Sequence, residues 1–179
     1  MTPSRLYRFS IQALACRLLA AGLIAMPMAG GALAQEPSRL SEVYGDWTVN
    51  CVAGENDART CFMVQTLSDE NRRRVLQAEI RLIGSTTQFA LLAPLGVLLP
   101  AGVSANIDDG AAETFAYHTC LAAGCIVRSE LSAEKVAELR RGQEMTVRLK
   151  AADSGGEVTL RLSLSGISAA LSRLAKLSG

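Results

Sequence analysis

The stretch Met145–Leu164, with the sequence MTVRLKAADSGGEVTLRLSL, is the clearest indication of the fold class of this chain. Its apolar residues Met145, Val147 and Leu149 alternate with polar ones, and the same alternation resumes after the turn-forming residues 153–156. Strict alternation is typical of a strand with one face on a core and the other in water. Two such strands joined by a glycine-rich turn predict an antiparallel hairpin.

Other segments repeat this pattern. Alternating runs also cover Trp47–Cys51 and Leu76–Leu82, and turn-forming residues occur at Gly84-Ser85 and at Asp108-Asp109-Gly110. Many short strands separated by turns predict an all-β fold, which is either an antiparallel β-sandwich or a partly open barrel. The alternation does not distinguish between these two architectures.

Two short surface helices complete the predicted fold. The first is expected between Ser132, a preferred N-terminal capping residue, and Gly142, a residue that commonly follows a helix. The second starts near Ile167, because Leu171 and Leu174 follow it at helical spacing. We expect its apolar side to lie on the surface of a sheet.

Residues 1–34 are predicted to be a secretory signal peptide. They carry three arginines and no acidic residue, then a short apolar run, and they end in Ala32-Leu33-Ala34, which fits signal peptidase. A membrane anchor is one alternative, but glycine and proline interrupt a run that is already short for a spanning helix. A lipoprotein site at Cys16 is another, although the apolar segment follows this cysteine instead of preceding it.

The exported chain is expected to be one domain, 35–179, with no transmembrane segment. Its first part, from Gln35 to Val43, is polar and without a clear period, which predicts a mobile lead-in. Removing the three leader arginines from the 18 basic residues leaves 15, against 17 acidic residues. This slightly acidic balance argues against nucleic acid as a partner.

Four cysteines remain after cleavage, and an even number in an exported chain indicates disulfides. Spacing favours the pairs Cys51–Cys61 and Cys120–Cys125, because each pair flanks a turn and opposed residues of antiparallel strands lie within disulfide reach. Zinc and thioredoxin-like redox sites are the alternatives. Both typically use C-x-x-C spacing, which neither pair has.

Residues that usually perform catalysis are scarce. His118 is the only histidine, and neither a G-x-S-x-G motif nor a phosphate-binding glycine motif accompanies it. The acidic turn at Asp108-Asp109-Gly110 lacks the spacing of a calcium loop, and the only tryptophan, Trp47, is assigned to the core. We therefore expect no catalytic residue, no cofactor and no metal, and a protein that is not an enzyme.

One apolar run differs from the rest of the chain. Residues 89–103 carry no charge and no alternation, and Pro94 and Pro100 prevent a continuous helix or central strand. A buried strand followed by a core-crossing loop is one interpretation, and an exposed partner-binding strip is the other. We expect most of the run to be buried beneath the second helix, with the corner Pro94-Leu95-Gly96 at the surface as a partner-binding site.

Five short motifs occur in order along the chain. They are Tyr44–Cys51 (YGDWTVNC), Cys61, Leu92–Gly102 (LAPLGVLLPAG), Cys120 with Gly124-Cys125, and Ser163-Leu164-Ser165-Gly166. Together they resemble the invasion-associated locus B family of exported bacterial proteins, over nearly the whole exported chain. Two residues depart mildly from the family pattern. Tyr44 stands where phenylalanine is common, and Ile167 stands where an aromatic residue is often found. The resemblance implies a β-sandwich-like fold, a periplasmic or surface location, a role in host-cell invasion and no catalytic residue.

The resulting functional hypothesis is an exported, non-enzymatic cell-envelope protein that acts as a binding or structural module. Its partner is expected to be a protein of the envelope or of a host surface, and its location to be the periplasm, the outer-membrane surface or the medium. An accessory or chaperone-like subunit of a membrane complex is the main alternative. A periplasmic enzyme is the third.

Overall fold

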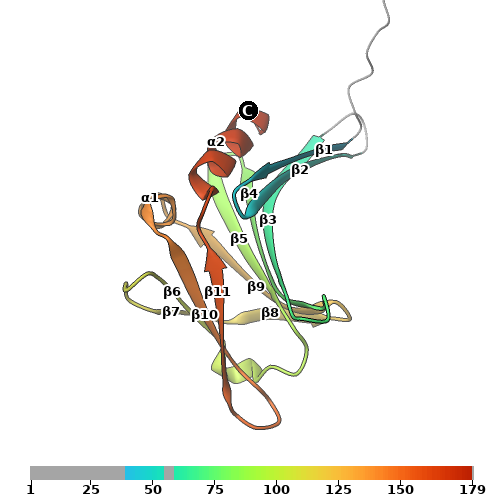
Figure 1. The fold of residues 1–179 in the computed structure, drawn as a ribbon, viewed down its shortest axis with the longest axis vertical. Helices are drawn as coiled ribbons and strands as arrows, with labels where there is room; N and C mark the ends of the chain where they lie inside the picture. Colours follow the sequence, from blue (N-terminus) through green and yellow to red (C-terminus); the bar gives the residue numbers. More distant parts are fainter. Residues whose placement is uncertain (1–38, 55–58, 179) are drawn as a thin grey trace, which may run out of the picture. The chain divides into compact units, whose positions relative to one another are not determined.

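Two antiparallel sheets build the part of the protein that the computed structural model describes, residues 39–54 and 59–178 (Figure 1). In spatial order, the larger sheet consists of β1 (Arg39–Tyr44), β2 (Trp47–Ala53), β3 (Arg59–Ser68), β4 (Arg74–Ile83), β5 (Thr86–Ala93), β9 (Gly124–Leu131) and β8 (Tyr117–Leu121). The smaller sheet consists of β11 (Glu157–Ser163), β10 (Glu144–Lys150), β6 (Val103–Ile107) and β7 (Glu113–Phe115). The predicted signal peptide and its cleavage site before Gln35 lie outside the described residues.

The hairpin predicted from the alternating stretch is confirmed. It is formed by β10 and β11, in which Met145 pairs with Leu162 and Val147 pairs with Leu160. The side chains of Met145, Val147 and Leu162 are buried, while the polar residues between them face outward. Period-two patterning has therefore placed one face of this hairpin on the core, as the sequence predicts.

The fold is a β-sandwich, not a barrel. Each sheet presents its buried face to the other, and the larger one contributes most of the core. Its inward side chains include Trp47, Val49, Met63, Leu76, Ala78, Ile80, Phe89, Leu91 and Val127. Each sheet also ends in edge strands, β1 and β8 in one and β11 and β7 in the other, so no continuous ladder closes the described part of the chain.

Both predicted helices are present. Helix α1 (Ala133–Arg141) begins after Ser132, whose hydroxyl accepts a hydrogen bond of 3.1 Å from the backbone N–H of Lys135. Helix α2 (Ile167–Leu177) buries Ile167, Leu171 and Leu174 and packs mainly against β1, β2, β3 and β4. Neither of these helices is long and apolar enough to cross a bilayer, and the described residues contain no other that is.

The mobile lead-in predicted up to Val43 is wrong from Arg39 onward. Residues 39–44 form β1, which pairs with β2 along its whole length. Leu40 and Tyr44 are half-buried on one side of this strand, and Glu42 lies between them. A glutamate at an inward position hides the period-two pattern, and its partner comes from α2, more than 100 residues later in the chain.

Candidate functional site

The four cysteines form the two predicted pairs. Cys51 and Cys61 are bonded, with 2.07 Å between their sulfur atoms, and they oppose each other in the ladder of β2 and β3. Cys120 and Cys125 are bonded in the same way across β8 and β9. Both bonds therefore link adjacent strands. Cys51 and Cys61 are buried, whereas Cys120 is exposed beside the buried Cys125.

Two of the sequence motifs meet at a joint between β11 and the turn that connects β1 and β2. The indole N–H of Trp47 donates a hydrogen bond of 3.0 Å to the carbonyl of Ser163, and the amide of Gln65 donates to the same oxygen at 2.9 Å. The backbone N–H of Asp46 donates to Ser165. Motifs that are more than 100 residues apart in sequence are thus one structural unit.

The glycine that follows β11 is required by this joint. Gly166 has a φ of 82°, and a Cβ atom there would lie 2.0 Å from the carbonyl oxygen of Tyr44. A second close approach joins the central apolar motif to the second cysteine pair, because a Cβ atom at Gly124 would lie 2.2 Å from the carbonyl oxygen of Ala93. The motifs that carry the family resemblance therefore include the backbone contacts that hold the sandwich together.

The corner Pro94-Leu95-Gly96 reaches the surface at the end of β5. Leu95 has 59% of its surface exposed. The exposed region continues beyond the corner, because Leu98 is 36% exposed and Leu99, in the short 3-10 helix η2 (Leu99–Ala101), is 49% exposed. Here we call residues 94–100 the apolar loop.

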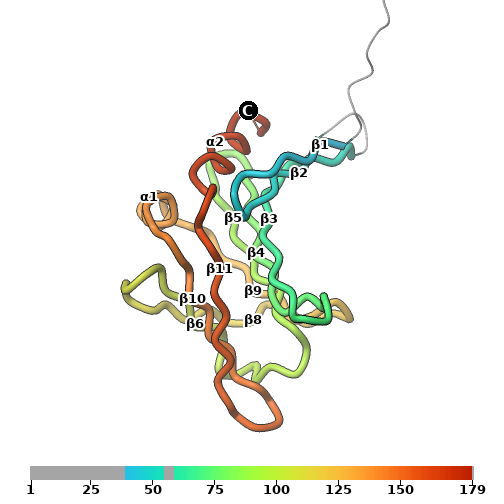
Figure 2. Tube along the Cα trace, viewed as in Figure 1, coloured from blue at the N-terminus to red at the C-terminus, as the bar shows by residue number. Residues whose placement is uncertain are grey.

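Backbone hydrogen bonds tie the apolar loop to the turn between β10 and β11. The carbonyl of Gly96 accepts a bond of 2.8 Å from Ala152, and the N–H of Leu98 donates one of 2.8 Å to Lys150. Val97, between them, is 9% exposed and points toward the core. Figure 2 shows the apolar loop and the turn between β10 and β11 at the same end of the fold. The loop is therefore an ordered surface that presents leucine side chains to solvent.

The expectation that α2 covers most of residues 89–103 is wrong. Helix α2 lies mainly on β1 to β4, and six residues of this run, Pro94, Leu95, Gly96, Leu98, Leu99 and Pro100, are exposed. The residues in β5 follow the alternation of a strand, with Phe89 and Leu91 buried. Their neighbours Ala90 and Leu92 are apolar although they lie on the opposite, outer face, which is why the run showed no period.

That outer face contains a shallow groove of about 630 Å³ over β4, β5 and β9. Ala90, Leu92 and Ile126 line it together with charged side chains, among them Arg128 and Glu130. The groove was not predicted from the sequence, because the alternation within a strand identifies its buried face and says little of its outer face. The available signal was a set of apolar residues at outward positions of three adjacent strands.

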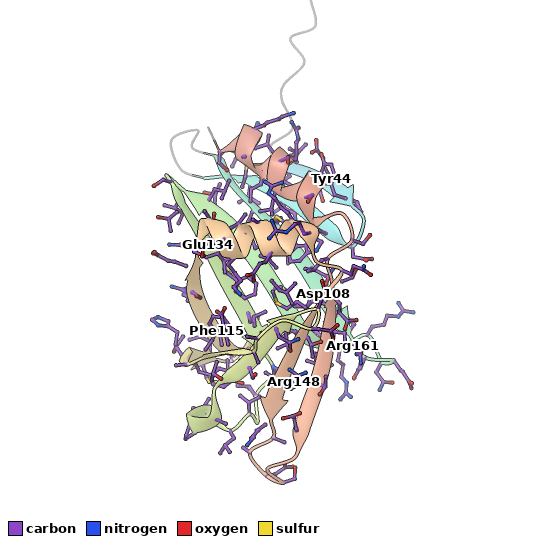
Figure 3. The ribbon with its side chains drawn as sticks, turned by 90° about the vertical axis from the view of Figure 1, so that its left-hand side faces the viewer. Tyr44, Asp108, Phe115, Glu134, Arg148 and Arg161 are labelled. Carbon is purple, nitrogen blue, oxygen red and sulfur yellow. A yellow bond between two sulfur atoms is a disulfide. The ribbon has the colours of Figure 1, made fainter. Side chains whose placement is uncertain are left out.

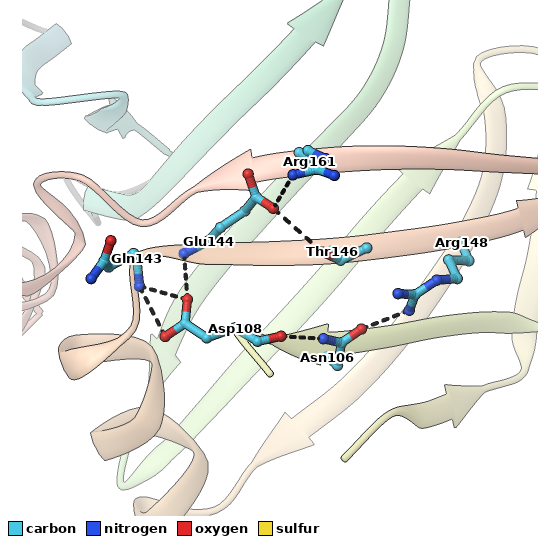
Figure 4. A network of polar contacts seen from close by, with 7 residues as sticks. All are labelled: Asn106, Asp108, Gln143, Glu144, Thr146, Arg148 and Arg161. Atoms are coloured by element: carbon cyan, nitrogen blue, oxygen red, sulfur yellow. Dashed lines mark hydrogen bonds and ion pairs between the residues drawn. The ribbon is translucent and has the colours of Figure 1, made fainter. Parts of the chain in front are cut away.

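Asp108 lies at the turn predicted from its sequence and has a second role. Its carboxylate accepts hydrogen bonds of 3.0 Å from the backbone N–H groups of Gln143 and Glu144, where α1 leads into β10 (Figure 4). The N–H of Asp108 in turn donates to the carbonyl of Glu144. All these donors are backbone groups of the chain itself, so the acidic turn fastens β6 to β10.

The residues considered for catalysis do not converge. His118 is exposed on the edge strand β8. Across residues 39–54 and 59–178, no group of three His, Cys, Asp or Glu side chains is placed to hold a metal ion. The expectations of no catalytic residue, cofactor or metal remain predictions.

A bidentate ion pair joins α2 to β1. Arg173 donates hydrogen bonds of 2.7 and 2.9 Å to the two carboxylate oxygens of Glu42, and the hydroxyl of Tyr44 donates one of 2.8 Å. The bonds from Arg173, and then that from Tyr44, lower the pKa of the Glu42 carboxyl. A lysine of α1, Lys135, bridges Glu113 and Glu138, and these hydrogen bonds raise the pKa of its ammonium group.

Comparison with known proteins gives a consistent result. The family model described as Invasion associated locus B (IalB) protein matches residues 47–175. An invasion protein B homolog of Brucella abortus (strain 2308) is 37% identical over 139 residues, which cover 76% of this chain and 80% of the relative. Invasion protein B of Bartonella bacilliformis is 32% identical over 145 residues, which cover 78% of this chain and 77% of the relative.

A solved structure shares the fold. The crystal structure of invasion associated protein B from Bartonella henselae aligns with a TM-score of 0.71 and 32% sequence identity, and the alignment covers 77% of this chain and 96% of that chain. The relatives and the two disulfides, which are typical of oxidising compartments, indicate an exported protein. The chain belongs to the invasion-associated locus B family.

Proposed function

We propose that this protein is a binding module of the cell envelope that acts without catalysis and contributes to host-cell invasion. The apolar loop is the observation that carries the proposal. It exposes Leu95, Leu98 and Leu99 together, on a backbone fixed by two hydrogen bonds to the neighbouring turn. Soluble proteins rarely expose clustered large apolar side chains on an ordered surface unless a partner covers them.

The partner proposed is a protein of the bacterial envelope or of a host surface with an apolar contact site. Ordered leucines lose little conformational entropy on binding, because the loop that carries them is already fixed. The relatives are named invasion proteins, which supports a role in which contact with another protein is the activity. The periplasm, the outer-membrane surface and the medium are all compatible with this proposal.

The test is a substitution at the corner. Leu95→Asp places a charge where 59% of the side chain is already exposed, so we expect the thermal midpoint to change little. Binding to intact envelopes or host cells, measured by site-specific crosslinking from position 98, should fall by at least about tenfold, because a charge enters an apolar contact.

Ile83→Asp is the matched control. Ile83 is a similarly exposed apolar residue (56%) near the turn between β4 and β5, outside the apolar loop. It should leave both the thermal midpoint and the binding unchanged. Unfolding of Leu95→Asp would show that Leu95 belongs to the core, and equal binding by the two variants would exclude the apolar loop as the contact.

A further inference from the structure

The outer edge of the small sheet has backbone groups aimed at solvent. Two hydrogen bonds at the ends of β10 and β11 show which opposed pairs of this ladder are hydrogen-bonded. The backbone N–H of Ala151 donates to the carbonyl of Gly156, and that of Leu164 donates to the carbonyl of Gln143. Hydrogen-bonded pairs alternate with non-bonded pairs along an antiparallel ladder. The even-numbered residues of β11 therefore bond to β10, and the odd-numbered ones direct their N–H and C=O groups away from it.

One of these outward carbonyls is already used. It belongs to Ser163, which accepts the hydrogen bonds from Trp47 and Gln65 and so confirms the direction of the odd-numbered residues. The other three odd-numbered residues of β11 are Glu157, Thr159 and Arg161. Among the residues that the structure describes, β11 pairs with β10 alone, so these three residues present a row of unbonded donors and acceptors. Such a row can receive another strand.

We propose that this edge pairs with the same edge of a second copy of the chain, antiparallel and centred on Thr159. In that register Glu157 lies opposite the partner's Arg161, and Arg161 lies opposite the partner's Glu157. The central pair joins Thr159 to the partner's Thr159. All three pairs fall on residues whose backbone groups point outward, so three hydrogen-bonded pairs form across the two-fold axis. The charge sequence of β11 is thus complementary to its own reverse, as a symmetric interface requires.

The exposure of the side chains agrees with an open edge. The side chains of Arg161 and Glu157 are 72% and 54% exposed, and Arg161 is placed over the outer face by a contact of 3.2 Å to Glu144 (Figures 3 and 4). On the other face, Val158 is 45% exposed and would lie opposite the partner's Leu160 in a close, non-bonded pair. Strand pairing would therefore form both ionic and apolar contacts between the two copies.

The edge strand β1 of the large sheet lacks this charge complementarity. In β1, the turn pair Tyr44 and Trp47 sets the alternation, so Arg39, Ser41 and Val43 point outward. Pairing two copies around Ser41 would place Arg39 opposite valine. Of these two edges, the charges of β11 alone favour a second copy.

The first test is the concentration dependence of association. Sedimentation equilibrium of the exported chain should show a reversible monomer–dimer equilibrium that is weak, because one strand pair buries less surface than a standard interface. Reversing one charge, Glu157→Arg or Arg161→Glu, places two like-charged pairs across the axis and should raise the dimer Kd by at least about tenfold. Thr159→Pro, which removes an outward N–H at an edge position, should do the same.

Mixing the two charge variants gives the decisive result. A chain with Glu157→Arg carries two positive positions and a chain with Arg161→Glu carries two negative ones, so the mixture should form heterodimers although neither variant self-associates. The double variant should restore association to near the level of the unmodified chain. Arg39→Glu, on β1, is the control and should leave association unchanged.

Three outcomes would overturn the proposal. They are an unmodified chain that stays monomeric at millimolar concentration, charge variants that dimerise as well as the unmodified chain, and a loss of association caused by Arg39→Glu alone. Thermal melting of each variant separates these outcomes from unfolding. If a single variant does not fold, the self-association of the unmodified chain and of Thr159→Pro still decides the question.

Discussion

Arg173 in α2 holds both carboxylate oxygens of Glu42 in β1, at 2.7 and 2.9 Å. This ion pair fixes the C-terminal helix to the edge strand of the large sheet. The two side chains are 34% and 29% exposed, so solvent screens the pair only in part. Tyr44 adds a third hydrogen bond to the same carboxylate.

This contact predicts a stability that depends on pH. Because the pKa of Glu42 is lowered in the folded state, its contribution is present above the ordinary carboxyl pKa and is lost as the pH falls through the lowered value. Glu42→Gln should therefore lower the thermal midpoint at pH 7, and the difference from the unmodified chain should shrink steadily as the pH falls below 4.5. Glu130→Gln, at an exposed position of β9, is the control and should leave the thermal midpoint at pH 7 unchanged.

Much of the fold could be predicted from local patterning. The hairpin of β10 and β11, the capped helix after Ser132 and both disulfides depend on residues close together in the sequence. Strand β1 could not be predicted, because Glu42 occupies an inward position that the distant Arg173 helps to make favourable. The choice between sandwich and barrel depends on strand order, which alternation does not encode.

The close approach at Gly166 predicts a substitution with a large effect. Gly166→Ala introduces a Cβ atom 2.0 Å from the carbonyl oxygen of Tyr44, so the joint between β11 and the first hairpin must open. We expect a loss of about 3 kcal/mol or more in the free energy of unfolding, measured by urea denaturation.

The matched control for this substitution is Gly155→Ala. Gly155 also has a positive φ, of 66°, but a Cβ atom at this position would have no neighbour within 4 Å. It should cost only roughly 1 kcal/mol, which is the conformational penalty alone. Similar losses for the two variants would show that backbone conformation, and not the contact with Tyr44, explains the glycine at 166.

A buried glutamine gives a second test of the same joint. Gln65 is 4% exposed, and its amide donates to the carbonyls of Ser163 and Asp46 at 2.9 and 3.2 Å. Gln65→Leu keeps the volume but removes both donors, so the free energy of unfolding should fall by about 1–3 kcal/mol. Gln88→Leu, at an exposed position of β5, provides the comparison and should have little effect. An unchanged stability of Gln65→Leu would mean that the two hydrogen bonds from Gln65 make no net contribution to the joint.

The candidate site could be predicted only in part. The corner at the surface was predicted correctly from Pro94, because this proline ends β5. The extension of the exposed region to Leu98 and Leu99 was missed, because the loop is held by the turn between β10 and β11 instead of being covered by α2. The free edge of β11 was also missed, since a strand at an edge has the same sequence pattern as one inside an antiparallel sheet.

The two disulfides should differ in how readily they are reduced. Thiol–disulfide exchange requires access to a sulfur atom, and Cys120 is exposed whereas Cys51 and Cys61 are 1% and 7% exposed. Mild reduction of the folded protein, followed by alkylation and peptide mass spectrometry, should label Cys120 and Cys125 first. Labelling of Cys51 and Cys61 should require conditions that unfold the protein. If both pairs are labelled at the same rate under native conditions, β2 and β3 must open as easily as the exposed hairpin of β8 and β9, and the assignment of Cys51 and Cys61 to a stable core would be wrong.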